Sequence, residues 1–582
     1  MTATVTRLPE LDNASPELAT TELASAAPAN TLLTAGAITT SAALLAACGG
    51  GGGGSASSTP PSSTTPPPVV TTPITDAQAS RFLAQASMGA TRTEMSKVQS
   101  LGYAGWINAQ MALPATTSRY AWLVAAGFNN ITYKNSESGF DASNWKKLIN
   151  SPDTLRQRVT LALSEITVAA IDGLIGGGWR SFAAATYLDL LESHAFGNYR
   201  DLLGQISTSA PMGEYLTFRG NVKYNPTTGA MPDENYAREI MQLFSIGLVM
   251  LNLDGTPQLA NGQQVETYTL TDITGLARIF TGWDFDLQGK DTSTPDFLNR
   301  PMIQIASRHE TGASTFLNTT IPAGLDGATS MNQALDWIFA HQNVAPFISK
   351  QLIQKLVTSN PSPAYVQRVA TVFNNDGNGV KGNLSAVISA ILLDTEARAD
   401  VADASSTSFG KQREPILRFT TWARAYNANS PSDAWAIGDT TNPATKLGQS
   451  PLRSPTVFNF FRPGYVPPNS GISSASLVAP EFQLTNESSV VGYVNFMQNA
   501  VSNGIGDMKA DYSSLLPLAD NAQNLVNELN TVIAAGQISA ANVTLIVNAI
   551  TSMPSGTDPT RYNRIYAALT MVLAAPEFIV LK

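Results

Sequence analysis

The stretch LRQRVTLALSEI, residues 155–166, gives the clearest indication of the fold. Its apolar residues recur at i, i+4, i+7, i+8 and i+11, in Leu155, Val159, Ala162, Leu163 and Ile166. Because an α-helix turns once every 3.6 residues, this spacing puts all five on one face. We therefore predict a helix here, with its apolar face turned toward a core.

The same helical spacing recurs along the chain. It appears in Ala184, Leu188, Leu191 and Ala195, in Ile348, Leu352 and Leu356 behind Pro346, and in Leu384, Val387, Ile388, Ile391 and Leu392. Thr75-x-x-Gln78 has the form of a capping box. A second start lies at Thr91-x-x-Glu94, and we expect that helix to stop near Gly102.

The predicted fold class is mainly α: a large multi-helix globular body with long irregular loops and little β. The loops are two Pro/Gly/Ser/Asn-rich stretches, 286–330 and 426–475. Only VETYTLT, residues 265–271, has the composition of a short strand.

Composition excludes some functions. Charged residues make up 14% of the 582, well below the roughly 25% of an average soluble protein, and the net charge is −9. No Lys/Arg run interrupts this acidic balance, so we expect no nucleic-acid partner, which would need a basic patch to neutralise phosphates. The only cysteine is Cys48, which rules out an intramolecular disulfide and a cysteine-based metal site in the body.

The N-terminal region has the form of an export signal. An uncharged apolar stretch, residues 31–47, ends in Leu45-Ala46-Ala47-Cys48. This ending resembles the bacterial lipobox, in which the cysteine is lipidated and becomes the mature N-terminus. The alternative is a free cysteine beside a hydrophobic stretch. The segment ahead of the apolar core is net acidic where a signal should be basic, which points to a start further downstream or to another export route.

These features divide the chain into three parts. Residues 1–48 form the signal and lipobox segment, 49–74 a Gly/Ser/Thr/Pro-rich tether, and 75–582 one large helical domain. We expect the protein to be lipid-anchored at Cys48 in the bacterial cell envelope, in the periplasm or on the outer surface, with the tether holding the body away from the membrane.

The segment PDENYAREIMQLFSIGLVMLNLDG, residues 232–255, contains the densest set of candidate functional residues. Glu234 and Arg238 stand at i, i+4, where they can pair, and Glu239 projects about 100° around the helix from Arg238. Buried carboxylates beside an arginine could serve acid–base chemistry, because burial and an opposite charge shift their pKa values in opposite directions. The alternative is an intrahelical ion pair with a purely structural role.

His309 is the fourth candidate, since it lies in the polar loop sequence SRHETGAST. His194 and His341, the other two histidines, are expected at helix ends. The chain has no HExxH and no GxSxG motif. NNDGNGVKGN, residues 374–383, has the look of a calcium loop, but Ser385 stands where the bidentate glutamate should be, so we interpret it as a turn between helices. The sequence assigns neither a metal nor a cofactor.

These motifs together resemble the bacterial domain-of-unknown-function 1800 family along nearly the whole body. The matching runs are 81–91, 155–166, 194–203, 211–216, 234–248, 276–283, 308–317, 344–366, 447–465 and 479–483. The resemblance implies an exported protein without a defined activity, and a sulfatase-like exported partner. The family's loop often reads His-x-x-Gly-x-Lys, whereas Ser314 stands at the lysine position here.

Two functions remain open. The first is a hydrolase acting on an envelope or extracellular polymer, with Glu234, Arg238, Glu239 and His309 in one pocket. The second is a non-catalytic binding or assembly protein, in which these residues are structural and the two long loops form the interface. The distance between Glu239 and His309 distinguishes the two functions, because residues that share a proton-transfer site must lie within hydrogen-bonding reach.

Overall fold

Residues 155–166 supply the central helix, α5 (Thr154–Ser164), in the computed structural model of the protein, which describes residues 73–399 and 407–582. The helix is buried on nearly every side rather than on one face only. Its polar side chains have buried partners: Gln157 accepts a hydrogen bond from Arg119, and Arg158 donates to the carbonyl of Lys355. These bonds offset part of the cost of burying polar groups, while Arg158 Nε and Nη1 have no hydrogen-bond partner among the described residues.

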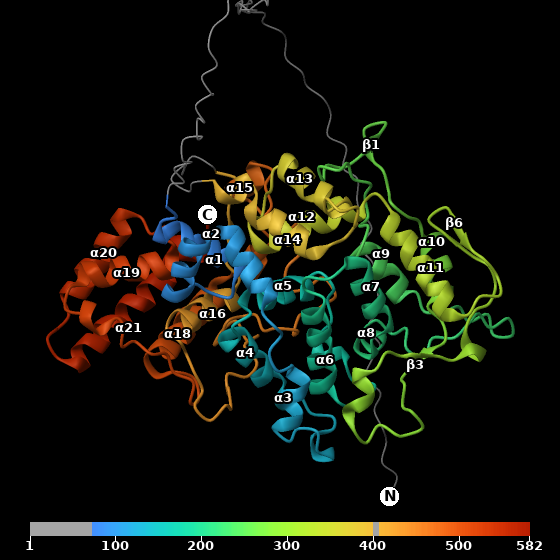
Figure 1. Ribbon diagram of the computed structural model, residues 1–582, viewed down its shortest axis with the longest axis horizontal. Coiled ribbons are helices and arrows are strands. Elements are labelled where there is room, and N and C mark those ends of the chain that lie inside the picture. The colour runs from blue at the N-terminus through green and yellow to red at the C-terminus, as the bar shows by residue number, and fades with distance from the viewer. Residues whose placement is uncertain (1–72, 400–406) are drawn as a thin grey trace, which may run out of the picture. The chain divides into compact units, whose positions relative to one another are not determined.

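Two hydrophobic cores explain this burial. Leu155, Val159, Ala162 and Leu163 belong to the first core, and Leu161 on the opposite side belongs to the second. Figure 1 shows α5 in the middle of the body, with the orange and red helices α18–α21 on one side and the green helices α7–α11 on the other. A helix between two cores needs apolar residues on both sides.

The helices before α10 have these bounds: α1 Asp76–Ala86, α2 Arg92–Ala112, α3 Arg119–Ala125, α4 Phe140–Asn150, α6 Arg180–Ser193, α7 Tyr199–Thr208, α8 Ala210–Tyr215 and α9 Asn235–Gln242. Thr75 and Gln78 form the predicted capping box of α1, and Thr91 caps α2. The helix at Thr91 was expected to stop near Gly102. Instead, Gly102 adopts a left-handed φ of 71° and the helix resumes beyond it, so α2 is kinked there.

The later helices are α10 Leu270–Ile279, α11 Gly327–Ala340, α12 Val344–Leu356, α13 Pro363–Asn374, α14 Leu384–Leu393, α15 Thr395–Arg398, α16 Pro415–Ala425, α17 Gly471–Ser474, α18 Glu487–Asn503, α19 Ala522–Ala534, α20 Ala540–Thr551, α21 Asp558–Ala574 and α22 Pro576–Ile579. Short 3₁₀ turns are η1 Ile131–Tyr133, η2 Ile171–Gly173, η3 Pro295–Asn299, η4 Ala306–Arg308, η5 Pro480–Leu484 and η6 Leu516–Leu518. The stretch 374–383 is the turn between α13 and α14 that the sequence predicts.

Strands are few and short in the described residues, and they form four antiparallel pairs: β1 Leu259–Ala260 with β2 Gln263–Gln264, β3 Trp283–Asp284 with β4 Ile303–Gln304, β5 Ser314–Phe316 with β6 Thr319–Ile321, and β7 Lys411–Gln412 with β8 Val580–Leu581. With 22 α-helices in the described chain, the mainly α fold is confirmed.

The strand expected at 265–271 forms only in part. Glu266 makes an isolated antiparallel bridge with Val249, supported by backbone hydrogen bonds from Met250 to Val265 and from Thr267 to Leu248. Thr269 then caps α10 in a capping box with Asp272, so the rest of the segment turns into a helix.

The two predicted loops are largely irregular. Between residues 286 and 330 the structure has two 3₁₀ turns, three short strands and the start of α11, and between 426 and 475 only the one-turn helix α17. None of the helices in the described ranges is both long and apolar enough to cross a bilayer. Cys48, the signal segment and nearly all of the tether lie outside the described residues.

Candidate functional site

Glu234 and Arg238 form the ion pair that their spacing allows, but at the surface. Arg238 Nη2 lies 3.4 Å from Glu234 Oε2, and the two side chains are 41% and 30% exposed. The other oxygen of Glu234 accepts a hydrogen bond from Thr274 on α10, at 2.7 Å. The pair therefore joins the start of α9 to α10 without enclosing a buried charge.

Glu239 is the buried member of the group. Its exposure is 6%, and its Oε2 atom has no hydrogen-bond partner among the described residues. Burial raises the pKa of Glu239, and the charge of Arg238 partly opposes this rise. Burial together with the Glu239 carboxylate raises the pKa of Tyr268 to about 12. Glu239 is thus a carboxyl group that a low-dielectric environment shifts toward its protonated form.

His309 follows η4 and is 2% exposed, although the polar sequence around it predicts an open loop. Its Nδ1 atom is 3.3 Å from the Thr281 hydroxyl and 3.2 Å from the Thr281 carbonyl, while Nε2 has no partner in the described part of the chain. No hydrogen bond or ion pair among the described residues connects His309 with Glu239, so the structure does not join the four candidates by contacts.

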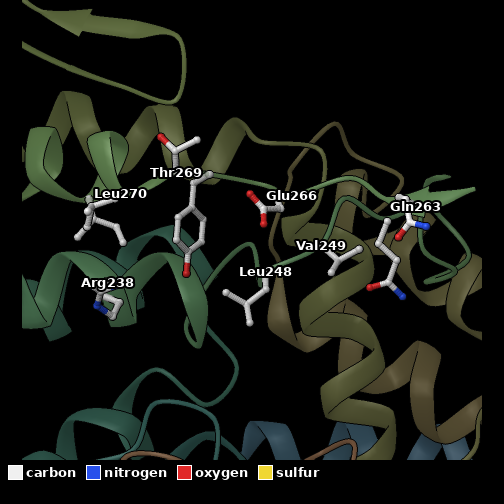
Figure 2. A pocket seen from close by; sticks show the side chains of 10 residues that line it. Arg238, Leu248, Val249, Gln263, Glu266, Thr269 and Leu270 are labelled. Atoms are coloured by element: carbon white, nitrogen blue, oxygen red, sulfur yellow. The ribbon is translucent and has the colours of Figure 1, made fainter. Parts of the chain in front are cut away.

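A pocket of about 530 Å³ lies beside α9. Figure 2 shows Arg238 and Leu270 at one end of it and Gln263 at the other, with Leu248 and Glu266 between them. Tyr268, which interacts with Glu239, also lines the pocket. Its wall is therefore mixed, with both signs of charge, amide groups and aliphatic side chains.

A larger cavity of about 660 Å³ adjoins this pocket, because Leu248 and Val249 line both. Four stretches far apart in the sequence contribute to it, namely 242–255, the face of α12 with the residues after it, Ser408, and the long loop between Phe458 and Val478. Its wall is mostly apolar, with Leu243, Leu251, Phe347, Phe458, Leu477 and Val478 as the main hydrophobic side chains. Sequence periodicity gave no sign of this cavity, since loops supply much of it.

A buried ionic cluster lies next to the cavity. Gln351, Gln354 and Pro463 line both the cavity and a void of about 10 Å³ that Lys355 and Glu481 also contact. Lys355 Nζ is 3.1 Å from Glu165 Oε2, and Lys411 Nζ is 3.0 Å from Glu481 Oε1 and 3.7 Å from Glu414 Oε1. The side chains of these five charged residues are at most 5% exposed.

Two carboxyl groups of this cluster, Glu165 and Glu414, are hydrogen-bonded to each other. Burial and the Glu414 charge raise the pKa of Glu165. Burial also opposes ionisation of Glu414, but the hydrogen bond from Glu165 and the charges of Lys411 and Lys355 bring its pKa below the usual range. The pair therefore shares one proton, because two facing carboxylates cannot both ionise in a dry site.

Sequence reasoning did not identify this cluster. Lys411 and Glu414 precede α16 directly, and charges at a helix start ordinarily lie in solvent. Only the fold shows that this segment is covered. In the described chain, no three His, Cys, Asp or Glu side chains come together in a way that could hold a metal ion.

Residues 81–580 match the model of a family described as a protein of unknown function, DUF1800. The chain belongs to the DUF1800 family. No curated protein and no solved structure matches it.

Four of the sequence stretches that match the DUF1800 family contribute residues to the buried ionic cluster. Arg158 and Glu165 come from 155–166, Lys355 from 344–366, Phe461 from 447–465 and Glu481 from 479–483. Ser314, which replaces the lysine frequent in the DUF1800 loop, donates a 2.5 Å hydrogen bond to the Gly275 carbonyl. At this position the present chain ties β5 to α10.

Proposed function

We propose that this DUF1800 protein is exported, lipid-anchored at Cys48 in the bacterial envelope, and binds an amphipathic ligand in its two adjoining cavities. The observation that carries the binding function is the mostly apolar 660 Å³ cavity sharing Leu248 and Val249 with a polar 530 Å³ pocket. This volume falls within the range of small-molecule sites, and apolar walls with few polar groups are their usual lining. A ligand with an apolar and a polar part matches both halves.

Leu248 offers a test of the binding function because it lines both cavities and is itself 56% exposed. A charge there should disturb the cavity wall without disturbing the core. We expect wild-type protein to bind the neutral fluorophore N-phenylnaphthylamine saturably. Leu248→Asp should weaken this binding about tenfold, which corresponds to about 1.4 kcal/mol.

Leu545→Asp is the matched control, since Leu545 is an exposed leucine on α20 that lines neither cavity. It should leave the affinity unchanged. Absence of saturable binding by the wild type, or equal binding by Leu248→Asp, would contradict the proposal.

Export and anchoring rest on the sequence Leu45-Ala46-Ala47-Cys48. A single acyl chain binds a membrane only weakly. We therefore expect the lipid groups attached at a processed lipobox cysteine to act together as the anchor. Cys48→Ala is expected to move the protein from the membrane to the soluble fraction and to abolish incorporation of labelled palmitate. Unchanged results in both assays would disprove the anchor.

Hydrolysis of an envelope or extracellular polymer is the second candidate function, and Glu239 is the observation that favours it. A carboxyl group with a raised pKa beside a pocket can act as a general acid, typically accelerating a reaction about 10²–10⁴-fold. If the protein hydrolyses a panel of nitrophenyl esters and glycosides, Glu239→Gln should lower the rate about 100-fold at an unchanged melting temperature. A rate that falls only in step with stability assigns Glu239 a structural role.

The family resemblance also leads us to propose a sulfatase-like exported partner. The two long loops, 286–330 and 426–475, are the surfaces we expect it to contact. Co-purification of a sulfatase-like protein from detergent-solubilised envelopes, reversed by shortening the 426–475 loop at its exposed positions, is the expected result.

A further inference from the structure

Lys350 is the only charged side chain that lines the larger cavity in the described chain. It lies on α12 and makes no hydrogen bond and no ion pair with any described residue. The closest acidic influence is Asp254, whose carboxylate already accepts hydrogen bonds from the backbone amide and hydroxyl of Thr256. Burial lowers the pKa of Lys350. The amine thus faces an apolar space without a dedicated counter-ion.

Gln351, the next residue, is 9% exposed and lines both this cavity and the small void beside Lys355 and Glu481. Its Nε2 group is buried and has no hydrogen-bond partner among the described residues, which costs stability. This amide therefore lies below the cavity surface, and Lys350 carries the donor that a ligand can reach.

Two neighbouring amides are already satisfied. Gln354 Nε2 donates to the carbonyls of Ser359 and Pro463, and Asn360 exchanges two hydrogen bonds with the backbone of Val478. No Asp or Glu of the described chain lines this cavity. Among the remaining donors of the lining, the Lys350 amine is the one that carries a charge, and it favours an anionic oxygen.

We infer that the larger cavity binds a single-chain anionic amphiphile, whose carboxylate or phosphate head group is held by Lys350 Nζ. Its hydrocarbon chain lies against Leu243, Leu251 and Phe347. This inference rests on the proposed binding function and narrows it to one ligand class. A cationic head group is disfavoured by Lys350, and a neutral one leaves the amine uncompensated.

Displacement of N-phenylnaphthylamine from the full-length protein distinguishes these head groups. Four competitors of equal chain length are compared: dodecanoate, dodecyl phosphate, dodecanol and dodecyltrimethylammonium. We expect at least one of the two anions to bind about tenfold more tightly than dodecanol, and the cation to bind more weakly than dodecanol. Tighter binding by only one anion identifies the head group as carboxylate or phosphate.

Lys350→Met should remove the advantage of the anions and leave the affinity for dodecanol unchanged, because the methionine keeps the apolar wall. Lys350→Arg should retain most of the advantage. Gln351→Leu should raise the melting temperature, since it removes the buried unpaired donor. Lys97→Met, on the exposed surface of α2, is the control and should change nothing.

The inference is overturned if dodecanol binds as tightly as both anions, or if Lys350→Met weakens all four competitors equally. Failure of the proposed binding function looks different, because then the fluorophore and all the competitors fail to bind.

Discussion

The shared proton between Glu165 and Glu414 makes two chemically identical residues unequal. Glu165 is held near its protonated form, whereas Glu414 carries the charge that Lys411 and Lys355 compensate. Gln449 adds a 2.9 Å hydrogen bond to Glu414 Oε2. A neutral amide should therefore be tolerated at one position and not at the other.

We expect Glu165→Gln to cost about 1 kcal/mol or less of the free energy of unfolding, because glutamine keeps the shape and a donor toward Glu414. Glu414→Gln should cost about 3–5 kcal/mol, because it strands buried lysine charges. Urea unfolding at pH 7 measures both. Equal losses would show that the proton does not reside on Glu165.

Glu214, on α8, predicts a pH dependence of stability. Burial raises its pKa to about 7, against the charge of Arg219 and the facing backbone amides of Gly177 and Gly176. In the unfolded chain the value is 4.5, so the folded state binds more protons between these two values. Stability from this residue is fully present below pH 4.5 and is lost as the pH rises to 7, by up to about 3 kcal/mol.

Glu214→Gln should remove this slope and be more stable than the wild type at pH 8. Urea unfolding of both proteins at intervals from pH 4.5 to 8 measures the difference. Parallel curves would mean that Glu214 ionises normally in the folded protein.

Arg238 should contribute little to stability. Its pair with Glu234 is largely open to solvent, and exposed pairs of this kind are worth about 0.2–1 kcal/mol. A buried pair would have cost about 3–5 kcal/mol on losing one partner. Arg238→Ala should therefore lower the free energy of unfolding by less than about 1 kcal/mol in a urea titration. A larger loss would indicate that the guanidinium has a further partner.

At the scale of elements, α10 and β5 approach each other through a glycine. A Cβ atom at Gly275 would lie 1.9 Å from the Thr315 carbonyl oxygen, so only glycine allows this contact. Ser314 donates to the Gly275 carbonyl, and the Leu317 amide donates to Asp272 Oδ1 at 2.7 Å. These bonds hold the 308–317 loop, with His309, against α10.

Gly275→Ala is expected to destabilise the protein by about 1–3 kcal/mol, because the strand must move away. Gly204→Ala on α7 is the matched control. There the new methyl group meets only the flexible end of Arg200, and a helical alanine should stabilise by up to about 1 kcal/mol. Thermal melting compares the two, and equal melting temperatures would exclude the close approach.

At the scale of the whole molecule, the C-terminal residues bind segments that are distant in the sequence. β8 pairs with β7 in the register Lys411 to Leu581, and the Arg413 amide donates to the Ile579 carbonyl. Arg81 on α1 donates to the Lys582 carbonyl at 2.6 Å, so residues 501 positions apart meet. Figure 1 shows the C-terminus beside α1 and α2.

Removing residues 578–582 should destabilise the protein strongly. The loss of fully buried Phe578 alone should cost about 3–5 kcal/mol, and Lys411 would lose its strand partner. A chain beginning at Ile74 should instead melt like a chain beginning at Cys48, because residues 49–73 have few apolar side chains to bury. Differential scanning calorimetry tests both ends, and a loss of several degrees in the chain starting at Ile74 would show that the tether packs on the body.

Helices and their starts could be predicted from the sequence because the interactions that form them are local. The face of Leu155 to Ile166, the capping box at Thr75 and the helix behind Pro346 each depend on residues within a few turns. The same holds for the Glu234–Arg238 pair, whose partners are four residues apart. Family membership too was apparent from short runs of sequence.

The burial of charge and the shape of the cavities depend on contacts between distant segments. Glu165 and Glu414 are 249 positions apart and Arg81 meets Lys582, and no local pattern predicts such pairings. His309 lies in a polar sequence yet is buried, with its Nδ1 atom against the hydroxyl and carbonyl of Thr281, 28 positions earlier. Periodicity reports which face of an element is apolar, but it carries no information about which other elements cover the remaining faces. The carboxyl pair and the place of the Lys350 amine in the larger cavity both depend on such contacts between distant segments.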